Sequence, residues 1–413
     1  MIVETILFAL MGISLGLPLG LMPGMHINNV LPLILSLSFL FPSPYNLVVF
    51  IISIAVTQIF VSFIPSIFLG APDENTALSV LPGHRLLFEG RGYEAIKLTV
   101  IGGMGSLLFC ILFLSLFAGI FSWLYDMSRP FIHFVISFVV VLMIVMEKKM
   151  KRMLAAAFVI GLSGLFGIFV LNSSVVPQQQ VLFPVLSGLF GVSNLIVSVS
   201  QKSKIPEQTE DTTLKVSSKD IFRSIALGTF AGVIVGLLPA IGVSQAAIMT
   251  QYLGGTGEAR NFLVSLSGIN VANEVFSLVS LYLLGNPRSG ASVAIQKILT
   301  ELTFFDVAYI IGVICFASGV AAVLTLFLGK KIPKFLERLN YKTISLSIII
   351  FITAMVFLLS GMAGLLVLFS SVSIGLVCAH LGVRKSQCMG VLLIPSILFF
   401  ANLNPLVVSF LKL

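Results

Sequence analysis

Long apolar runs separated by short polar stretches extend along the whole chain. Runs of about 17 or more apolar residues predict membrane helices, because about 20 helical residues cross the hydrocarbon layer of a bilayer. The pattern therefore predicts an all-α polytopic membrane protein. Full spans are expected at 45–69, 98–125, 131–146, 153–171 and 181–199 in the first half, and at 262–284, 305–328, 344–359, 362–380 and 388–410 in the second.

Two further apolar segments, at residues 3–41 and 221–253, are each broken by a proline. Proline removes a backbone donor and clashes with the preceding turn, so each helix is expected to end there. Glycines at four-residue spacing lie on one helix face and permit close packing. Their role is therefore expected to be packing. The two motifs are Gly12-x-x-x-Gly16-x-x-x-Gly20-x-x-Pro23-Gly24 and Gly228-x-x-x-Gly232-x-x-x-Gly236-x-x-Pro239-Ala240.

Other features recur in the same order in both halves. Gly70-Ala71-Pro72 has a counterpart in Gly285-Asn286-Pro287, and the VLFP of 181–184 resembles the LLIP of 392–395. Matches in one order indicate internal duplication. The expected division is a first transmembrane repeat at 1–200, a hydrophilic cytoplasmic linker at 201–220 and a second transmembrane repeat at 221–413. The linker has the composition of a solvated loop.

Basic residues set the expected orientation of the repeats. The basic loop of the first half is at 148–152, whereas those of the second half lie one element earlier, at 330–342, and one later, at 384–385. Because cytoplasmic loops carry the excess of Lys and Arg, this shift indicates opposite sidedness. We therefore expect two inverted-topology repeats, each with about five spans and one broken or re-entrant helix hairpin. Both termini would then lie outside the cytoplasm.

Composition narrows the class of protein. Of 413 residues, 58% are hydrophobic and 10% are charged, and the net charge of +8 fits the positive-inside bias. The four cysteines form no close pair and no metal-type spacing, and no nucleotide loop or catalytic triad is present. We expect a multi-pass protein of the cell (cytoplasmic) membrane that is not an enzyme and does not bind nucleic acid.

Polar residues beside the two breaks are candidates for substrate binding. Irregular backbone at membrane depth needs protein, water or ligand to satisfy its N–H and C=O groups. A helix that restarts after a break presents free N–H groups and a positive dipole end, which suits an anion. The alternative is a pair of proline kinks with structural caps. The candidates are Pro23, Gly24, His26, Asn28, Asn29, Pro239, Ser244 and Gln245.

Two polar segments, dip 1 (residues 70–97) and dip 2 (residues 285–297), are expected to enter the protein partly instead of forming free loops. Acidic groups at such places can bind a coupling cation, Na⁺ or H⁺, and no other cofactor or metal is expected. The alternatives are loop-tip residues in water and, for Glu274, a hydrogen bond between helices. Substrate-binding candidates are Gly70, Pro72, Asn75, Thr76, Asn273, Pro287, Arg288 and Ser289, and ion-coupling candidates are Asp73, Glu74 and Glu274.

The stretch at 66–103, SIFLGAPDENTALSVLPGHRLLFEGRGYEAIKLTVIGG, resembles the long signature of the large permease subunit of tripartite tricarboxylate transporters, the TctA family. Residues 16–29 resemble the first Pro-Gly motif of that family, and 268–290 its second-half signature. The chain departs from the family pattern at Pro239-Ala240, at Asp73-Glu74-Asn75 and at Arg288, and it is shorter than a typical large subunit. It is most similar to a shorter, divergent, archaeal-type branch.

The resemblance implies a secondary transporter of small carboxylates such as citrate, driven by Na⁺ or H⁺. It also implies a small membrane subunit and an extracytoplasmic binding protein as partners. We therefore predict cation-coupled transport of a di- or tricarboxylate-like organic anion, by alternating access around a midplane site between paired broken-helix tips. Two alternatives remain: transport of a polyprenyl-phosphate-type carrier lipid through its anionic headgroup, and a non-transporting accessory membrane subunit. The other partners to consider are the lipid bilayer and a second copy of the chain, as a homodimer.

Overall fold

The computed structural model describes residues 2–22, 27–73, 75–128, 130–173, 176–177, 180–200, 206–209, 213–237, 242–253, 255, 258–285, 287–299, 301–336 and 341–411. Within these ranges the regular structure is helical. Seven of the described helical segments are long and apolar enough to cross a membrane, and shorter apolar helices accompany them at Ile132–Val145, Leu182–Val197 and Lys385–Phe400. The predicted class, an all-α polytopic membrane protein, is confirmed.

The helices of the first half are α1 (Ile2–Leu21), α2 (Ile27–Ser36), η1 (Ser38–Leu40), α3 (Pro44–Val61), α4 (Phe63–Leu69), η2 (Ala77–Ser79), α5 (Val80–Phe88), α6 (Gly92–Ser128), α7 (Ile132–Val145), α8 (Met150–Asn172), α9 (Leu182–Leu186), the π-helix η3 (Ser187–Val192) and α10 (Ser193–Ser200). Those of the second half are α11 (Ser218–Leu237), α12 (Val243–Leu253), α13 (Ala259–Leu284), α14 (Gly290–Ile298), α15 (Phe304–Leu336), α16 (Tyr341–His380), η4 (Lys385–Met389), α17 (Gly390–Phe400) and α18 (Asn404–Leu411).

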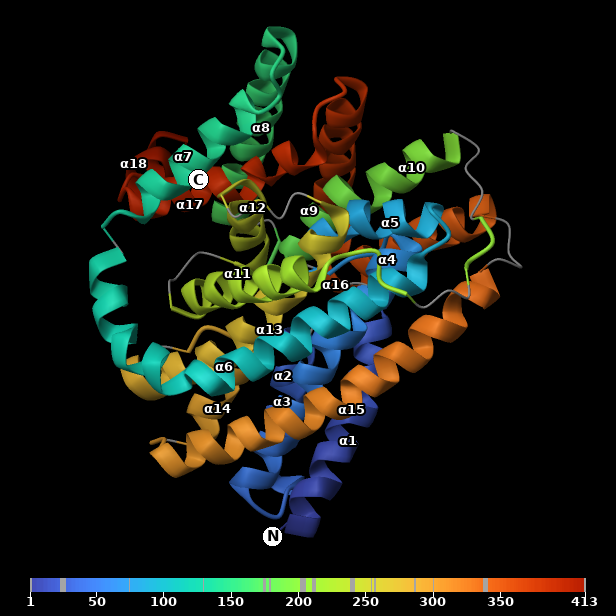
Figure 1. Ribbon diagram of the computed structural model, residues 1–413. Helices are drawn as coiled ribbons and strands as arrows, with labels where there is room; N and C mark the ends of the chain where they lie inside the picture. Colours follow the sequence, from blue (N-terminus) through green and yellow to red (C-terminus); the bar gives the residue numbers. More distant parts are fainter. Residues whose placement is uncertain are drawn as a thin grey trace.

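The core lies around two central helical segments, one from each half. In the most apolar stretch of each helical segment, the buried share is 89% for α3–α4 and 94% for α13. The corresponding buried share is only 28% for α1 and 22% for α16. The long helices α6 and α15 cross in front of this core (Figure 1). Exposed apolar side chains, such as Leu7, Leu112 and Leu358, cover the outer helices and suit contact with lipid.

Each proline-broken segment consists of two helices, as predicted. α1 ends at Leu21 and α2 begins at Ile27, while α11 ends at Leu237 and α12 begins at Val243. The breaking residues, 23–26 and 238–241, lie outside the described residues.

The glycines of both motifs pack against a central helix. A Cβ on Gly16 would lie 2.8 Å from the Ile54 carbonyl oxygen of α3, and a Cβ on Gly232 would lie 2.5 Å from Cβ of Ala272 on α13. Larger side chains would separate α1 from α3 and α11 from α13. The predicted packing role is confirmed.

The predicted spans differ from the observed helices in two places. A single span over 388–410 is wrong, because the chain turns between α17 and α18, where Asn402 has a left-handed φ of 56°. The span predicted over 181–199 contains the π-helix η3, which is unusual in a soluble or membrane helix. By contrast, α16 departs from helical geometry at Gly361 (φ 63°, ψ −159°), where the sequence separates two spans.

Three of the four cysteines are buried and Cys315 is half-buried, as expected of small core residues. Cys378 and Cys388 are joined by a side-chain hydrogen bond, so they form a close pair in space. The turn from α16 to η4 brings them together, whereas their spacing along the chain gives no sign of it. Among the described residues, no group of three or more His, Cys, Asp or Glu side chains is placed to hold a metal ion.

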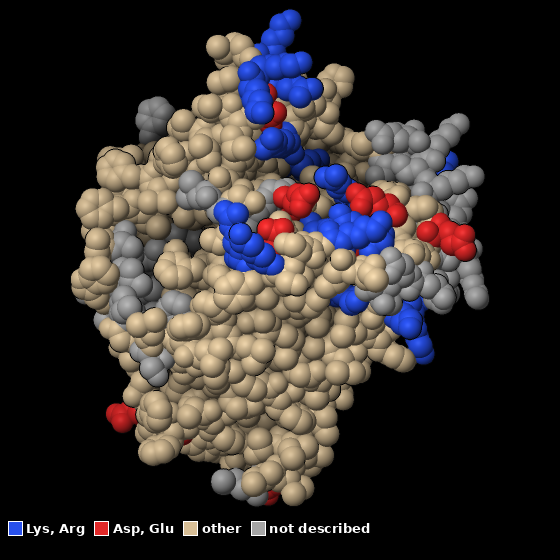
Figure 2. All heavy atoms as spheres, viewed as in Figure 1, with Lys and Arg blue, Asp and Glu red and all other residues tan. Residues whose placement is uncertain are grey.

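Charged side chains gather on one part of the surface. Figure 2 shows Lys, Arg, Asp and Glu over the upper part of the view, where α5 and α8 lie in Figure 1, whereas the visible lower part carries very few charges. The N-terminus lies at the lower end (Figure 1). We refer to the charged region as the basic face, and the positive-inside rule predicts that it contacts the cytoplasm.

The linker packs against the turn between α5 and α6. The Gln208 amide accepts a hydrogen bond from the Gly92 N–H (2.9 Å), and the Thr209 N–H donates to the Gly90 carbonyl (2.8 Å). The described linker residues, 206–209 and 213–217, are exposed or half-buried, and these hydrogen bonds anchor them to the protein.

A buried ion-pair cluster holds the second part of the linker. Glu94 pairs with Arg91 and with Arg260 of α13, whose Nε lies 3.1 Å from Glu94 Oε1. The same carboxylate accepts a hydrogen bond from the Lys215 N–H at 2.7 Å. The cluster therefore ties the linker to both halves of the chain.

Replacing Glu94 with glutamine is expected to release the linker. Removing one partner of a buried ion pair is strongly destabilising, because the other charge stays buried and unpaired. We expect trypsin to cleave after Lys215 about tenfold faster, which corresponds to about 1.4 kcal/mol of lost docking free energy. Mass spectrometry of timed digests in detergent measures this rate. The exposed Glu258→Gln variant is the control, and equal cleavage of the two variants would contradict the role of Glu94.

Candidate functional site

One face of α13 carries buried polar side chains at the depth of the core. Asn270, Glu274 and Ser277 share this face by their helical spacing, and they are 3%, 6% and 0% exposed. An ionisable residue within an apolar span is expensive to bury and is by default a candidate for function. We call these three residues the polar face of α13.

Dip 2 folds back onto the polar face. Gly285 ends α13 in the left-handed conformation (φ 65°), which turns the chain. The N–H groups of Arg288 and Ser289 both donate to the Ser277 hydroxyl, the first at 2.8 Å. The Ser289 hydroxyl donates to Glu274 Oε1 at 3.1 Å. Dip 2 is thus held at the polar face by both backbone and side-chain contacts.

Two features of dip 2 suit an anion. Ser289 is the N-cap of α14 and accepts from the Ser292 N–H at 3.2 Å, so the positive end of this helix lies beside the polar face. The Nε of Arg288 is buried and has no hydrogen-bond partner among the described residues. A buried donor of this kind needs a partner, and a carboxylate is the natural one for a guanidinium.

Dip 1 reaches the same helix face from the other half of the chain. The Asn270 amide donates to the Asn75 carbonyl at 3.4 Å. Gly70 ends α4 with φ 64°, and a Cβ there would lie 2.7 Å from the His84 ring. Pro72 packs against Gly191 of the π-helix η3. As predicted, this segment enters the protein: Ala71, Thr76 and Leu86 are among its buried residues.

Asp73 shapes the turn of dip 1. Its Oδ1 accepts from the N–H of Asn75 (3.1 Å), the N–H of Thr76 (2.8 Å) and the Thr76 hydroxyl (2.7 Å). This is the local hydrogen bonding expected of an aspartate that closes a turn. An ion-coupling role for Asp73 stays a prediction, and Glu74 lies outside the described residues.

His84 has a packing role in dip 1. Burial lowers the pKa of its ring to about 4, so the imidazole is neutral at pH 7. Its Nδ1 lies 3.4 Å from the Asn194 amide nitrogen, and its ring covers Gly70. These contacts give His84 a structural role in dip 1.

Glutamines cap the start of both half-helices that follow the proline breaks. Gln58 of α3 accepts from the Ile27 N–H at 2.8 Å, and Gln245 accepts from the Gly242 N–H at 2.9 Å. Ser244, in the first turn of α12, is buried. Gln58 was not among the predicted site residues, although it occupies in the first half the place that Glu274 has in the second. The structure does not describe Pro23, Gly24, His26 and Pro239 or the side chains of Asn28 and Asn29.

The two halves contribute to the site in a crossed manner. α2 of the first half packs against α14 of dip 2, and α12 of the second half packs against η2 of dip 1. Asn273 is placed differently, because its backbone lies against Gly232 of α11. Thus the structure brings Asn75, Glu274, Arg288 and Ser289 together near the polar face of α13. α2 adjoins this group through its contact with α14. Asn273 instead lies on the side of α13 that packs against α11.

Comparisons with known proteins agree with this architecture. The family model described as the tripartite tricarboxylate transporter TctA family matches residues 6–390. An uncharacterized protein of Methanocaldococcus jannaschii is 34% identical over 410 residues, which cover 96% of this chain and 98% of that protein. No solved structure matches the chain.

Proposed function

The chain belongs to the tripartite tricarboxylate transporter TctA family, and from this premise we propose that it transports a small organic anion by secondary, cation-coupled transport. The family is one of transporters and not of enzymes, and the several apolar helices make the protein a multi-pass membrane protein. The similarity to the Methanocaldococcus jannaschii protein fits a divergent branch. The proposed substrate class is the di- and tricarboxylates.

One observation carries this proposal: both dips meet the polar face of α13 in the buried core. Asn75 of dip 1 and Ser289 of dip 2 contact this face through Asn270 and Glu274. Irregular backbone and an ionisable side chain at this depth are characteristic of a transport site. The unpartnered Nε of Arg288 supports an anionic substrate.

In the proposed mechanism, Arg288 and the N-terminus of α14 bind a substrate carboxylate. Glu274 binds the coupling cation, Na⁺ or H⁺, and the cation offsets the negative charge of the loaded site. The two halves then move relative to each other, so that the site opens to one side of the membrane at a time. The equivalent packing of α1 on α3 and of α11 on α13 supports a duplication of the two halves, and the positions of the basic loops are the ground for proposing that the repeats are inverted.

The family suggests partners for this permease. We propose that a small membrane subunit and an extracytoplasmic binding protein assemble with it, and that the binding protein delivers the anion to the outer side. A second copy of the chain is a further candidate partner, and gel filtration with light scattering would measure the oligomeric state.

Purified protein in liposomes is expected to take up radiolabelled citrate when an inward Na⁺ or H⁺ gradient is imposed, because the gradient supplies the free energy for accumulation. Uptake is compared with and without each gradient, and in protein-free liposomes. The assay is repeated with an added binding protein. If citrate is not taken up but a polyprenyl phosphate raises the thermal stability of the protein, the carrier-lipid hypothesis would replace the carboxylate hypothesis. Absent uptake with no stabilisation by any anion or lipid would indicate an accessory subunit.

A further inference from the structure

A cavity of about 290 Å³ lies between dip 1, α12, α13 and η4, apart from the polar face of α13. From its residues we infer that this cavity is an anion-binding vestibule, which holds a polycarboxylate on the basic face before or after passage through the transport site. The inference rests on the proposed function and adds a second binding site for the same substrate. We call the cavity the vestibule.

The vestibule connects the basic face with dip 1. Its lining includes Ala77 and Leu78 of η2, which directly follow Thr76 of dip 1, and Arg85 at the end of α5. Gln251 of α12 lies on another wall. An anion in the vestibule would therefore contact both η2 of the first half and α12 of the second half, which pack against each other.

The charge of the lining is one-sided. Arg85, Arg384 and Lys385 line the vestibule, and no Asp or Glu is among the described residues of its lining. Low-dielectric walls around charges of one sign raise the local concentration of counter-ions. The lining thus favours an anionic ligand.

Arg384 is the principal candidate for binding. Its side chain is exposed, and no hydrogen bond of its guanidinium to another described residue is present, while its backbone N–H donates to Glu147 Oε1 at 3.1 Å. Arg85 pairs with Glu89 at 3.3 Å, but the two side chains are 70% and 38% exposed. Such an exposed pair contributes little free energy, so an arriving carboxylate can compete with it.

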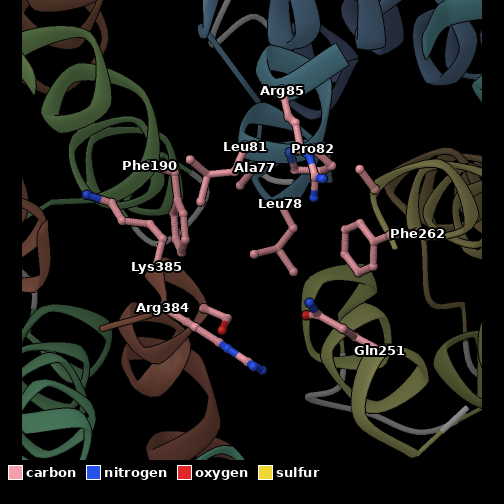
Figure 3. A pocket seen from close by; sticks show the side chains of 12 residues that line it. Ala77, Leu78, Leu81, Pro82, Arg85, Phe190, Gln251, Phe262, Arg384 and Lys385 are labelled. Carbon is pink, nitrogen blue, oxygen red and sulfur yellow. The ribbon is translucent and has the colours of Figure 1, made fainter. Parts of the chain in front are cut away.

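Lys385 contributes charge without pointing at the ligand. Its ammonium is turned away and donates to the Ser193 hydroxyl (2.8 Å) and the Gly375 carbonyl (2.7 Å). In Figure 3 its side chain runs behind Phe190, away from the centre of the vestibule. It is therefore suited to hold η4 against α10 and α16 and to position Arg384.

The arrangement of the two arginines indicates an anion with separated charges. In Figure 3, Arg85 enters from the top and Arg384 from the lower left, Leu78 lies between them, and Gln251 enters from the lower right. Phe190 and Phe262 supply apolar walls. A compact phosphate would be bound best by cations gathered at one point. A di- or tricarboxylate instead places a carboxylate at each end and its carbon chain against the apolar walls.

Citrate binding by the full-length protein in detergent tests the vestibule. Isothermal titration calorimetry compares the wild type with Arg85→Gln, Arg384→Gln and the double variant. Arg152→Gln is the matched control, because Arg152 is an exposed basic residue of α8 outside the vestibule lining. We expect the double variant to raise the Kd for citrate about tenfold or more, as loss of charge-assisted hydrogen bonds predicts, and the control to leave it unchanged.

Citrate counterflow in liposomes separates the failure of this inference from that of the proposed function. If the double variant binds citrate as tightly as Arg152→Gln and counterflow persists, the vestibule is not a binding site, although the transport proposal stands. If the wild type shows neither binding nor counterflow, both proposals fail. Inorganic phosphate is titrated in parallel, and phosphate binding as tight as that of citrate would overturn the assignment to a polycarboxylate.

A second measurement does not depend on removing the arginines. Leu81 lines the vestibule and is 42% exposed, while Cys110, Cys378 and Cys388 are buried and Cys315 is half-buried. The rate of maleimide labelling is measured for Leu81→Cys, and the background rate of the wild type is subtracted. Citrate should slow the remaining labelling of the introduced cysteine. Labelling that is insensitive to citrate would also overturn the inference.

Discussion

Glu274→Gln is expected to reduce gradient-driven citrate uptake at least about tenfold, while citrate counterflow stays close to that of the wild type. Glutamine keeps an oxygen that can accept from Ser289, which now donates to Glu274 Oε1 at 3.1 Å. It removes the negative charge that the proposed coupling cation requires. The loss should therefore fall on coupling and not on substrate binding.

Parallel assays with a Na⁺ gradient and with a pH gradient identify the cation. The gradient that drives uptake in the wild type, and no longer does so in Glu274→Gln, is the coupling gradient. Glu301→Gln serves as the control, because Glu301 is an exposed acidic residue in the same half. It is expected to behave as the wild type.

The opposite outcome would support the structural alternative for Glu274. If Glu274→Gln transports normally, while Glu274→Ala lowers thermal stability, the carboxylate serves only as a hydrogen-bond acceptor between helices. Removing the carboxylate takes one hydrogen bond from the Ser289 hydroxyl, which keeps its contacts with Ser292, and costs about 1 kcal/mol. Thermal unfolding of both variants measures this cost.

Gly102→Ala is expected to have the largest effect on stability among the glycine substitutions considered. A Cβ on Gly102 would lie 2.2 Å from the Val264 carbonyl oxygen of α13 and 2.9 Å from Val264 Cα. These are backbone atoms, so no side-chain rotation relieves the clash. α6 and α13 must separate, and such overpacking costs about 1–3 kcal/mol or more. Reversible unfolding in mixed detergent micelles measures the free energy.

The same helix supplies the control for this prediction. Gly119 is also in α6, and no atom lies within 4 Å of the position of its Cβ. Gly119→Ala should be neutral or stabilising by up to about 1 kcal/mol, from helix propensity alone. If the two variants change stability equally, the close approach of α6 to α13 is not present in the folded protein.

Much of the fold was predictable because its signals are local. Apolar runs mark helices wherever they pack, since the bilayer and the core both accept apolar side chains. The breaks predicted from Pro23 and Pro239 agree with the ends of α1 at Leu21 and of α11 at Leu237, because proline removes a backbone donor and clashes with the preceding turn. Gly70 and Gly285 each follow a helix in the left-handed conformation, which glycine adopts at little steric cost because it has no Cβ.

Other features of the protein could not be predicted from the order of residues along the chain. The linker has a polar composition, but Lys215 of the linker joins a buried cluster with Glu94 at the start of α6 and Arg260 of α13, from three separate segments. Gln58 caps α2 across a gap of 31 positions in the chain, and this contact depends on how α3 packs. The close pair of Cys378 and Cys388 depends likewise on the turn after α16.

The order of residues along the chain therefore predicts a membrane protein with two related halves, two proline breaks and two polar dips, and it carries the resemblance to the TctA family. Such features follow from local geometry and from the transfer of apolar residues out of water, and both act on each segment separately. The packing of the helices decided that both dips meet at the polar face of α13, and that Arg85 and Arg384 line one cavity. These arrangements join segments distant in sequence, and helix packing around α3 and α13 is a property of all segments together.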